Sequence, residues 1–179
     1  MAINSTESLV ICICACVGAL VIVYYTLRIL LHLLNYCCCR RRQNLLELYG
    51  NGERGVWAVV TGGSDGIGLE LCHQLAEQGF NICMMARNKN KMDEKLAQIK
   101  ELYPLCETKA IVADFSKLST MQQYRQLVSE IAHLDVGYLA LNTGIVQVGL
   151  TEQVTDSQFE SVFNVNGLQV VYMAKAMLD

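Results

Sequence analysis

The feature that most constrains this chain is a long uncharged run close to its amino end. The nineteen residues Leu9–Leu27 carry no formal charge, and nearly all of them are apolar. A helix of about 20 residues, rising about 1.5 Å per residue, crosses a hydrocarbon core of roughly 30 Å. Apolar residues continue to Tyr36, and Arg28 among them has a stem long enough to reach lipid headgroups. We therefore expect one transmembrane helix over residues 9–36, preceded by a short tail over residues 1–8.

The charges that flank this run predict its orientation. Only Glu7 precedes it, whereas Arg40, Arg41 and Arg42 follow it closely. Positive charge near the end of a membrane helix is retained on the cytoplasmic side, so we expect the tail in the lumen and the rest of the chain in the cytosol. A cleaved signal peptide is the alternative, but it places positive charge before a shorter apolar run.

Residues 37–54 have the composition of a Cys/Arg-rich juxtamembrane linker, which ends with the turn-forming Gly50 and Gly52. The cysteines Cys37–Cys39 are candidates for palmitoylation, and interfacial thiols without a special role are the alternative. Asn4 begins an N-glycosylation sequon in the expected tail, a few residues from the membrane. The sequence leaves the use of either modification open.

Charge and cysteine usage narrow the function classes. From Gln43 onward ten Lys or Arg face sixteen Asp or Glu, a negative balance that repels polyanions, so nucleic acid is not an expected partner. Cys72, Cys83 and Cys106 lack the paired spacing of a metal site, and we expect them to be reduced core residues of a cytosolic domain. The three histidines also have no ligand partners at suitable spacing, so no metal is expected.

Beyond the linker, short apolar runs alternate with amphipathic segments, which is typical of βαβ units on a parallel sheet. The pattern predicts an α/β fold, a Rossmann-type doubly wound parallel sheet over residues 55–179 that is incomplete and holds four βα units. Strands are expected over residues 56–60, 81–86, 108–113 and 137–142. Helices are expected over residues 66–78, 89–103, 116–132 and 156–178.

Apolar spacing predicts which faces of these helices are buried. Ile67, Leu71 and Leu75 repeat at every fourth position of the first helix. An incomplete sheet leaves an unpaired strand edge and an uncovered apolar face on the last helix, which favours a homo- or hetero-dimer with a second copy or a longer relative. The expected stripe on the last helix consists of Phe159, Val162, Phe163, Asn166, Val170 and Met173.

The loop between the first expected strand and the first expected helix is the clearest candidate for a ligand-binding segment. It reads Thr-Gly-Gly-Ser-Asp-Gly-Ile-Gly from position 61 to position 68. Glycines here let the chain turn tightly and approach a phosphate, while the helix amino end offers free N–H groups and a positive dipole. The loop therefore predicts dinucleotide binding. The expected cofactor-binding residues in it are Thr61, Gly62, Ser64, Asp65, Gly66, Ile67 and Gly68.

The spacing TGxxxGxG resembles the short-chain dehydrogenase/reductase family, and the resemblance runs from Val56 to the end of the chain. Within that family the chain looks most like the membrane-anchored very-long-chain 3-oxoacyl-CoA reductases and 17β-hydroxysteroid dehydrogenases, with their inactive hydroxysteroid dehydrogenase-like relatives. The amino-terminal span and the strings Trp57–Gly62 and Val112–Ser116 carry this closer match. The resemblance implies an endoplasmic reticulum membrane protein of fatty acid elongation or steroid metabolism that reduces a lipid-like carbonyl.

The end of the second expected strand indicates which dinucleotide is bound. An acid there holds the ribose 2′-hydroxyl of NAD, whereas an Arg accommodates the 2′-phosphate of NADP. This chain has Arg87 followed by Asn88 and no acid, which favours NADP(H), with an ordinary solvated Arg87 as the alternative. The family pattern implies that Asp114, after the third strand, binds the adenine.

The resemblance also assigns roles after the fourth strand. Asn142 and Gly144 match the family's NNAG or NNVG motif beside the cofactor, but Leu141 replaces the first Asn of that motif. Asn166 matches the Asn that helps to hold a proton-relay water, and it is the one catalytic residue that the resemblance carries over. A helix Asn that faces its neighbours is the alternative.

The family's hydride transfer also uses a Ser and a Tyr-x-x-x-Lys pair. The chain ends at Asp179, before the segment where these are expected, and Tyr172–Lys175 has the spacing YxxK. One hypothesis is a membrane-anchored NADPH-dependent oxidoreductase of lipid metabolism that lacks its Ser-Tyr-Lys within these residues. The other is a catalytically inactive, truncated nucleotide-binding or interaction protein, with a membrane adaptor as a third possibility.

Overall fold

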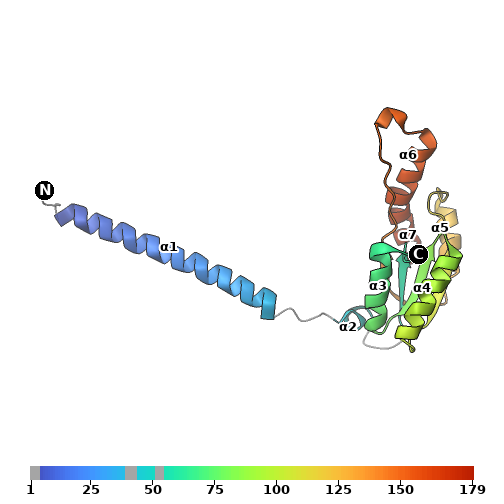
Figure 1. Cartoon of the computed structure of the whole chain (residues 1–179), viewed down its shortest axis with the longest axis horizontal. Helices are drawn as coiled ribbons and strands as arrows, with labels where there is room; N and C mark the ends of the chain where they lie inside the picture. Colours follow the sequence, from blue (N-terminus) through green and yellow to red (C-terminus); the bar gives the residue numbers. More distant parts are fainter. Residues whose placement is uncertain (1–4, 39–43, 51–54) are drawn as a thin grey trace. The chain divides into compact units, whose positions relative to one another are not determined.

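The computed structural model describes residues 5–38, 44–50 and 55–179, and the chain divides into two compact units, residues 1–43 and 44–179 (Figure 1). Several features of the sequence lie outside the described residues. These are Asn4 of the sequon, Cys39, the basic cluster Arg40–Arg42, and Gly52.

The described part of the first unit is the long helix α1, Ser5–Cys38 (Figure 1). Its stretch Leu9–Tyr36 has a mean hydropathy of 2.5, and the side chains there are exposed. The Thr26 hydroxyl donates to the carbonyl oxygens of Ile22 and Val23, at 2.5 and 3.1 Å, so this polar group is satisfied within the helix. By length and composition α1 is able to cross a membrane, a property that a signal sequence near an amino terminus shares.

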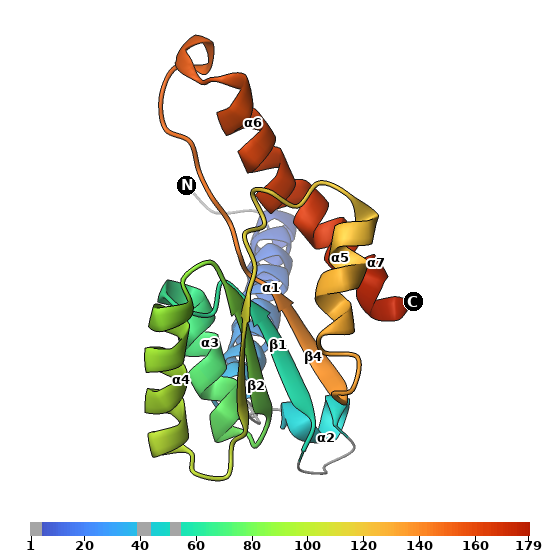
Figure 2. The ribbon, with the colours of Figure 1, turned by 90° about the vertical axis from the view of Figure 1, so that its right-hand side faces the viewer.

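The second unit is built on a four-stranded parallel sheet in the order β3-β2-β1-β4 (Figure 2). The strands are β1 (Trp57–Thr61), β2 (Asn81–Ala86), β3 (Thr108–Val112) and β4 (Val136–Leu141). Val59 of β1 pairs with Cys83 of β2 on one side and with Leu139 of β4 on the other. Every residue of β1 and β2 is buried, as central parallel strands covered on both faces require. The predicted α/β doubly wound parallel fold is confirmed.

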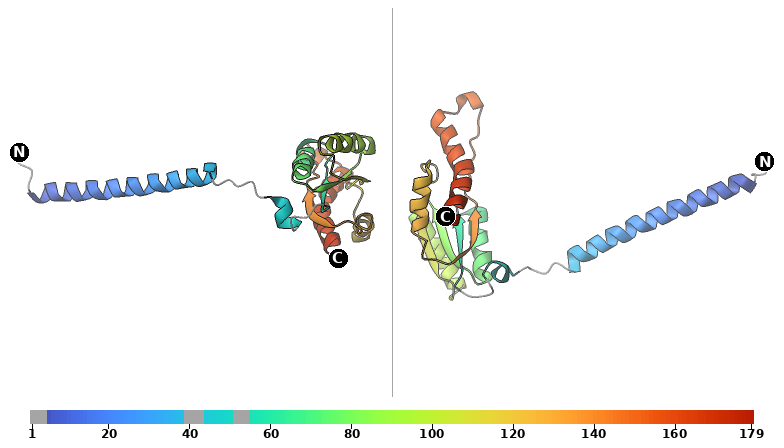
Figure 3. Two further views of the ribbon diagram at one scale, coloured as in Figure 1. Left: turned by 90° about the horizontal axis from the view of Figure 1, so that it is seen from below. Right: turned by 180° about the vertical axis from the view of Figure 1, so that it is seen from behind.

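Helices cover both faces of the sheet and bury two apolar cores (Figure 3). Ala58 and Val60 belong to the core beneath one pair of helices, whereas Trp57 and Val59 belong to the core beneath the other pair. This follows from the two-residue period of a strand, in which successive side chains point to opposite faces. The first pair is α3 (Gly66–Glu77) and α4 (Lys89–Leu102), and the second is α5 (Met121–Ser129) and α7 (Gln169–Leu178).

A short helix lies within the segment 37–54 that the sequence suggests is a linker. This helix, α2, covers Leu45–Tyr49 and begins at Asn44, whose side chain accepts a hydrogen bond from the Leu46 backbone N–H. Leu46 is buried in the core beneath α3 and α4. The second compact unit therefore begins at residue 44 and not at residue 55.

Two local interactions shorten the helix expected over residues 116–132. Asp114 accepts hydrogen bonds from the Ser116 backbone and hydroxyl at 3.2 and 2.7 Å, which closes a turn after β3. Thr120 and Gln123 then form a reciprocal capping box, so α5 begins at Met121. The prediction placed the start of the helix five residues too early because it read the polar turn as a first helical turn.

The last expected helix, 156–178, is interrupted by a π-helical turn. α6 covers Asp156–Phe163, the π-turn covers Asn164–Leu168, and α7 follows directly. A π-turn holds an extra residue, so the faces of α6 and α7 are out of phase. The six predicted positions therefore do not share one face: Phe159 and Phe163 are 51% and 64% exposed, as an uncovered apolar face would be, whereas Met173 is fully buried. The buried positions of the π-turn and α7 are Val165, Gln169, Met173 and Ala176.

The first helix of the sheet also departs from its predicted stripe. Leu75 is fully buried, but Ile67 is 82% exposed. Cys72 and Ala76, and not Ile67, complete the buried face of α3 together with Gly68. Ile67 lies in the first turn of the helix, at the carboxyl end of the sheet, where the helix extends past the core. The three predicted core cysteines, Cys72, Cys83 and Cys106, are buried free thiols, as expected.

Candidate nucleotide-binding site

The glycine loop lies at the carboxyl ends of the strands, where the strand order of the sheet reverses. β2 and β3 lie on one side of β1, and β4 lies on the other. In open α/β sheets such a switch point forms a crevice outside the carboxyl ends of the strands, and ligands bind there. Residues 62–65 join β1 to α3 at this crevice.

The glycines of the loop meet distinct steric demands. Gly62 and Gly66 have φ values of +67° and +51°, in the left-handed region that L side chains rarely adopt. At Gly68 the demand is close approach, because a Cβ there would lie 2.4 Å from the Gly62 carbonyl oxygen and 2.5 Å from Asn142 Nδ2. Gly68 therefore allows α3 to pack directly on the loop and on the end of β4, while Gly66 and Ile67 stay exposed.

A cavity of about 360 Å³ lies beside this loop. Six of the residues predicted to bind a cofactor line it, namely Gly62, Ser64, Asp65, Arg87, Asp114 and Gly144. The sequence did not assign the other lining residues to the site, and these are Ala86, Asn88, Lys91, Ala113, Phe115, Ser116, Thr143, Ile145 and Val165. Thr61, Gly68 and Asn142, which were also predicted, do not line the cavity but support the glycine loop, Gly68 by close packing and the other two by hydrogen bonds.

The buried Thr61 hydroxyl ties β1 to the loop that follows β4. Its oxygen accepts hydrogen bonds from the backbone N–H groups of Asn142 and Thr143 at 3.0 and 3.1 Å, and it donates to the Ala140 carbonyl at 3.3 Å. The Asn142 amide donates in turn to the carbonyl oxygens of Thr61 and Gly62, at 3.3 and 3.5 Å. Both residues thus position the glycine loop and do not line the cavity.

Gln169 is a member of this network that the sequence reading missed. It is fully buried, and its Nε2 donates to Thr61 Oγ1 at 3.1 Å. The amide therefore links α7 to the end of β1, across the second core. The signal in the sequence is an uncharged amide, Gln169, at the start of the mostly apolar end of the last helix. Leu141, which replaces the first Asn of the family motif, packs instead against this core.

Charged groups line the cavity on the side of β2 and α4. Arg87 follows β2 directly, and Lys91 lies in the first turn of α4, whose N-cap is Asn88. Lys91 Nζ lies 2.6 Å from Asp65 Oδ2, and the Asp65 Oδ1 atom accepts a hydrogen bond from the Gly66 N–H at 2.9 Å. The hydrogen bond from Lys91, followed by that from Gly66, holds the pKa of Asp65 below its usual range.

Asp114 follows β3, the strand next to β2, and it also lines the cavity. Partial burial opposes its ionisation, but the hydrogen bonds from Ser116, together with the charges of Lys117 and Arg87, outweigh that effect. The pKa of Asp114 is therefore below its usual range, and its carboxylate is an ionised acceptor at neutral pH.

Asn166 lies within the π-turn, and its amide clamps the loop that follows β4. Its Nδ2 donates to the Ile145 carbonyl at 2.8 Å, and its Oδ1 accepts from the Ile145 N–H at 3.0 Å. These two hydrogen bonds fix the backbone beside Gly144, which lines the cavity. Single π-turns in helices occur frequently at functional sites.

The arrangement fits an anionic dinucleotide. Glycines that accept no Cβ, the exposed first turn of α3, and two cations converge on one cavity at the switch point of the sheet. Such a turn offers N–H groups and a positive dipole to a pyrophosphate, and Arg87 and Lys91 offer positive charge to a further phosphate. The donor set therefore suits a dinucleotide, with cations placed for more than one phosphate.

Tyr172 and Lys175 lie away from this cavity. The Tyr172 ring packs edge-on against the Tyr124 ring, at 5.7 Å between centroids, and Lys175 is paired with the side chain of Asp179. Neither residue lines the cavity. Among the described residues there is also no group of three or more His, Cys, Asp or Glu that could hold a metal ion.

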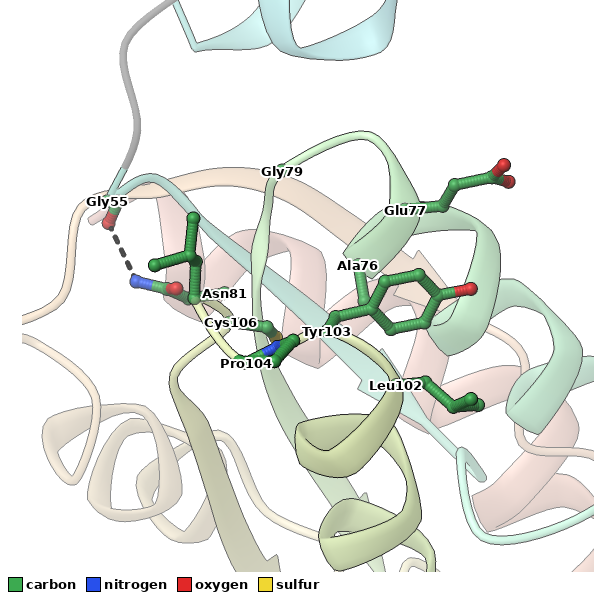
Figure 4. Close-up of a pocket in the computed structure, with 10 residues that line it drawn as sticks. Gly55, Ala76, Glu77, Gly79, Asn81, Leu102, Tyr103, Pro104 and Cys106 are labelled. Atoms are coloured by element: carbon green, nitrogen blue, oxygen red, sulfur yellow. Dashed lines mark hydrogen bonds between the residues drawn. The ribbon is translucent and has the colours of Figure 1, made fainter.

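A second cavity, of about 250 Å³, lies at the amino ends of the strands (Figure 4). Its lining is mostly apolar, and its amide, that of Asn81, is used by the fold: Nδ2 donates to the Gly55 carbonyl at 3.4 Å and Oδ1 accepts from the Glu107 N–H at 2.8 Å. The lining residues are Gly55, Ala76, Glu77, Gly79, Asn81, Leu102, Tyr103, Pro104, Leu105 and Cys106. The polar groups converge on the other end of the sheet, which is the candidate site.

The fold defines a doubly wound α/β protein, a class that binds ligands at the carboxyl edge of its sheet. Residues 56–179 match the model of the short chain dehydrogenase family, over all four strands. The chain therefore belongs to the short chain dehydrogenase family, a family of oxidoreductases, which confirms the resemblance seen in the sequence.

Curated relatives named very-long-chain 3-oxoacyl-CoA reductase are similar to this chain. The protein of Mycosarcoma maydis is 34% identical over 142 residues, which cover 75% of this chain and 40% of the relative. Reductase-B of Danio rerio is 34% identical over 141 residues, 73% of this chain and 44% of the relative. The protein of Macaca fascicularis is 30% identical over 174 residues, which cover 90% of this chain and 51% of the relative. The chain thus spans about half, or less, of the length of these relatives.

Solved structures of the family share the fold. A 7beta-hydroxysteroid dehydrogenase superimposes with a TM-score of 0.66 at 25% identity, over 76% of this chain and 49% of that one. A short-chain dehydrogenase from Sphingobium yanoikuyae in complex with NADPH superimposes with a TM-score of 0.61 at 25% identity, over 68% of this chain and 46% of that one. A blue fluorescent protein from a metagenomic library, also in complex with NADPH, superimposes with a TM-score of 0.60 at 30% identity, over 69% of this chain and 50% of that one.

Proposed function

We propose that this chain is the nucleotide-binding part of a membrane-anchored, NADPH-dependent oxidoreductase that reduces a lipid-like carbonyl. The cavity at the carboxyl edge of the sheet carries the proposal, because the glycine loop, Arg87 and Asp114 line it together. Neighbouring structures that contain NADPH support the choice of cofactor.

Each part of the cavity has a role in this proposal. The exposed first turn of α3 binds the pyrophosphate, and Arg87 binds the 2′-phosphate. Asp114, ionised and fixed by Ser116, accepts a hydrogen bond from the adenine amino group. Asn166 would help to hold the nicotinamide end, because its amide fixes the backbone at Ile145, beside Gly144 of the cavity. NADPH bound in this way supplies a hydride to a carbonyl carbon.

The proposed substrate and location follow from the relatives and from α1. The curated relatives are named for very-long-chain 3-oxoacyl-CoA, which makes a 3-oxoacyl-CoA the first candidate, with a 17β-ketosteroid as the second. α1 is proposed as a single anchor in the endoplasmic reticulum membrane, because it is long and apolar enough to span a bilayer and the relatives are named for a lipid substrate. Residues 44–179 are proposed to face the cytosol, because Arg40–Arg42 follow the apolar run and positive charge is retained on the cytoplasmic side.

A second candidate function is nucleotide binding without turnover, in a protein whose role is interaction. One observation favours it: within the described residues β4 pairs only with β1, and Phe159, Phe163 and Val171 are exposed. An open strand edge and exposed apolar side chains each suit a partner subunit better than a free surface.

The experiment is an NADPH titration of the full chain in lipid nanodiscs, followed by NADPH oxidation after addition of a long-chain 3-oxoacyl-CoA. Gly66→Val, which strains the loop, and Arg87→Ala are expected to weaken binding at least tenfold. Arg125→Ala is the matched control, since Arg125 pairs with Asp179 away from the cavity.

Binding with oxidation would support the enzyme and exclude nucleotide binding without turnover. Binding without oxidation would show that these residues hold the cofactor but do not complete the reaction, which both functions allow. A wild-type chain that is folded but binds no NADPH would contradict both functions, and equal loss of binding in Arg87→Ala and Arg125→Ala would contradict the proposed site.

A further inference from the structure

The candidate site contains a second cation besides Arg87, and an acid from the glycine loop holds it. Lys91 and Asp65 both line the cavity, Lys91 from the first turn of α4 and Asp65 from the residue before α3. Their charged atoms lie 2.6 Å apart. The Lys91 side chain is 39% exposed and that of Asp65 is 78% exposed, so the pair lies at the solvent side of the cavity.

The Asp65 carboxylate binds two groups that a bound anion would also use, a backbone N–H at a helix amino end and a lysine ammonium. One carboxylate oxygen accepts from the N–H of Gly66, the first residue of α3, and the other pairs with Lys91. A helix amino end and a lysine are the usual partners of a phosphate. The carboxylate is therefore positioned as an internal substitute for a phosphate group.

The geometry points to an exchange at this ion pair: Lys91 binds the 2′-phosphate of NADP(H) beside Arg87, and Asp65 competes with that phosphate for Lys91. The inference rests on the proposed function, because it assumes nicotinamide nucleotide binding in this cavity. A phosphate monoester carries about −1.5 to −2 charge at neutral pH, against −1 for Asp65, so it is the stronger partner for Lys91. Asp65 is mostly exposed, and water readily solvates the released carboxylate.

Two other lysines of α4, Lys89 and Lys95, are paired along the helix and do not line this cavity. Lys89 pairs with Asp93 at 2.8 Å, and Lys95 pairs with its neighbour Glu94 at 3.1 Å. Lys95 lies one helical turn beyond Lys91 and does not line the cavity. Lys95 is therefore the matched control: replacing it changes the net charge of α4 by the same amount as replacing Lys91, but it removes no charge from the cavity.

The experiment titrates the full chain in nanodiscs with two probes, 2′,5′-ADP and 5′-ADP, which differ only in the 2′-phosphate. Lys91→Gln is expected to weaken 2′,5′-ADP roughly tenfold and to leave 5′-ADP within about twofold. Lys91→Arg is expected to keep most of the affinity, and Lys95→Gln to change neither probe. Asp65→Asn, which retains an acceptor for Gly66, is expected to tighten 2′,5′-ADP severalfold relative to 5′-ADP.

Two results would overturn this inference and leave the proposed function standing. The first is a wild-type preference for 2′,5′-ADP that Lys91→Gln does not reduce. The second is a loss of 2′,5′-ADP affinity in Asp65→Asn, which would make Asp65 a support for Lys91 and not a competitor. A folded wild-type chain that binds neither probe would overturn both the inference and the proposed function.

Discussion

The two ends of the sheet hold cavities of similar size but opposite character. The cavity at the carboxyl end is lined by Arg87, Lys91 and Asp114, whereas the cavity at the amino end is mostly apolar and its Asn81 is bonded within the fold. The same four strands supply both ends. The difference arises because loops at the carboxyl end lead into helix amino ends, where free N–H groups and caps lie, and loops at the other end leave helix carboxyl ends. Only one end is thus equipped to bind an anion.

The largest expected effect is that of an added methyl group at Gly68, compared with one at Gly137. Gly68→Ala places a Cβ 2.4 Å from the backbone of Gly62, between elements that the core fixes, and we expect it to lower the free energy of unfolding by about 3 kcal/mol and to abolish NADPH binding. Urea denaturation and a nucleotide titration measure the two effects.

Gly137→Ala is the matched variant at the amino end of the sheet. Its Cβ would lie 2.3 Å from the Tyr49 carbonyl oxygen, but Tyr49 belongs to the five-residue helix α2, which is able to shift. We expect a cost of about 2 kcal/mol and unchanged NADPH affinity in the folded fraction. Loss of affinity here would show that the two ends are not independent.

A smaller effect is expected at Thr61, whose hydroxyl holds the carboxyl end together. Thr61→Val keeps the shape of the side chain but leaves the N–H groups of Asn142 and Thr143 and the Gln169 amide without their buried acceptor. We expect a loss of about 2 kcal/mol of stability and weaker NADPH binding. Thr61→Ser, which retains the hydroxyl, is the control, and it should behave like the wild type in both measurements.

The buried thiols provide a pH test of the two cores. Burial raises the pKa values of Cys72, beneath α3 and α4, and Cys83, beneath α5 and α7, to about 12. The folded state therefore favours the protonated thiols, so their contribution to stability is complete below about pH 9 and is lost as the pH rises from about 9 towards 12. Denaturation at a series of alkaline pH values, with Cys72→Ala and Cys83→Ala as comparisons, measures the slope. A stability that does not fall across this window would contradict it.

The smallest expected effect is at the amino-end cavity. Tyr103→Phe removes a hydroxyl there without changing the packing of the ring (Figure 4). We expect NADPH affinity within about twofold of the wild type and a change in stability of less than about 0.5 kcal/mol. A clear loss of nucleotide binding would mean that this cavity, too, belongs to the site.

The parts of the molecule that the sequence predicted are those that depend on local pattern. Each strand is an apolar run between turn residues, and Arg87 and Asp114 were placed at the cavity because residues that directly follow parallel strands meet at one edge. Lys91 could not be singled out in this way. It is one of several lysines in α4, and only the rotation of that helix against the sheet decides which of them reaches the cavity.

Three of the failures of prediction share a physical cause, which is hydrogen bonding that side-chain periodicity does not record. The π-turn over residues 164–168 shifts the phase of α7, so Met173 is buried while Phe163 is exposed. The turn that Asp114 and Ser116 form delays the start of α5. Gln169 was missed because its partner, Thr61, lies in the first strand, far away in the sequence.

The central place of β1 has a consequence for the order in which the domain is made. Val59 meets Cys83 soon after that residue has left the ribosome, but its other partner, Leu139, arrives much later in synthesis. β1, β2 and β3 with α3 and α4 are thus able to assemble first, and β4 closes a far longer loop of chain. Because Asn142, Thr143 and Gly144 follow β4, a nascent chain has an apolar core before it has a nucleotide cavity.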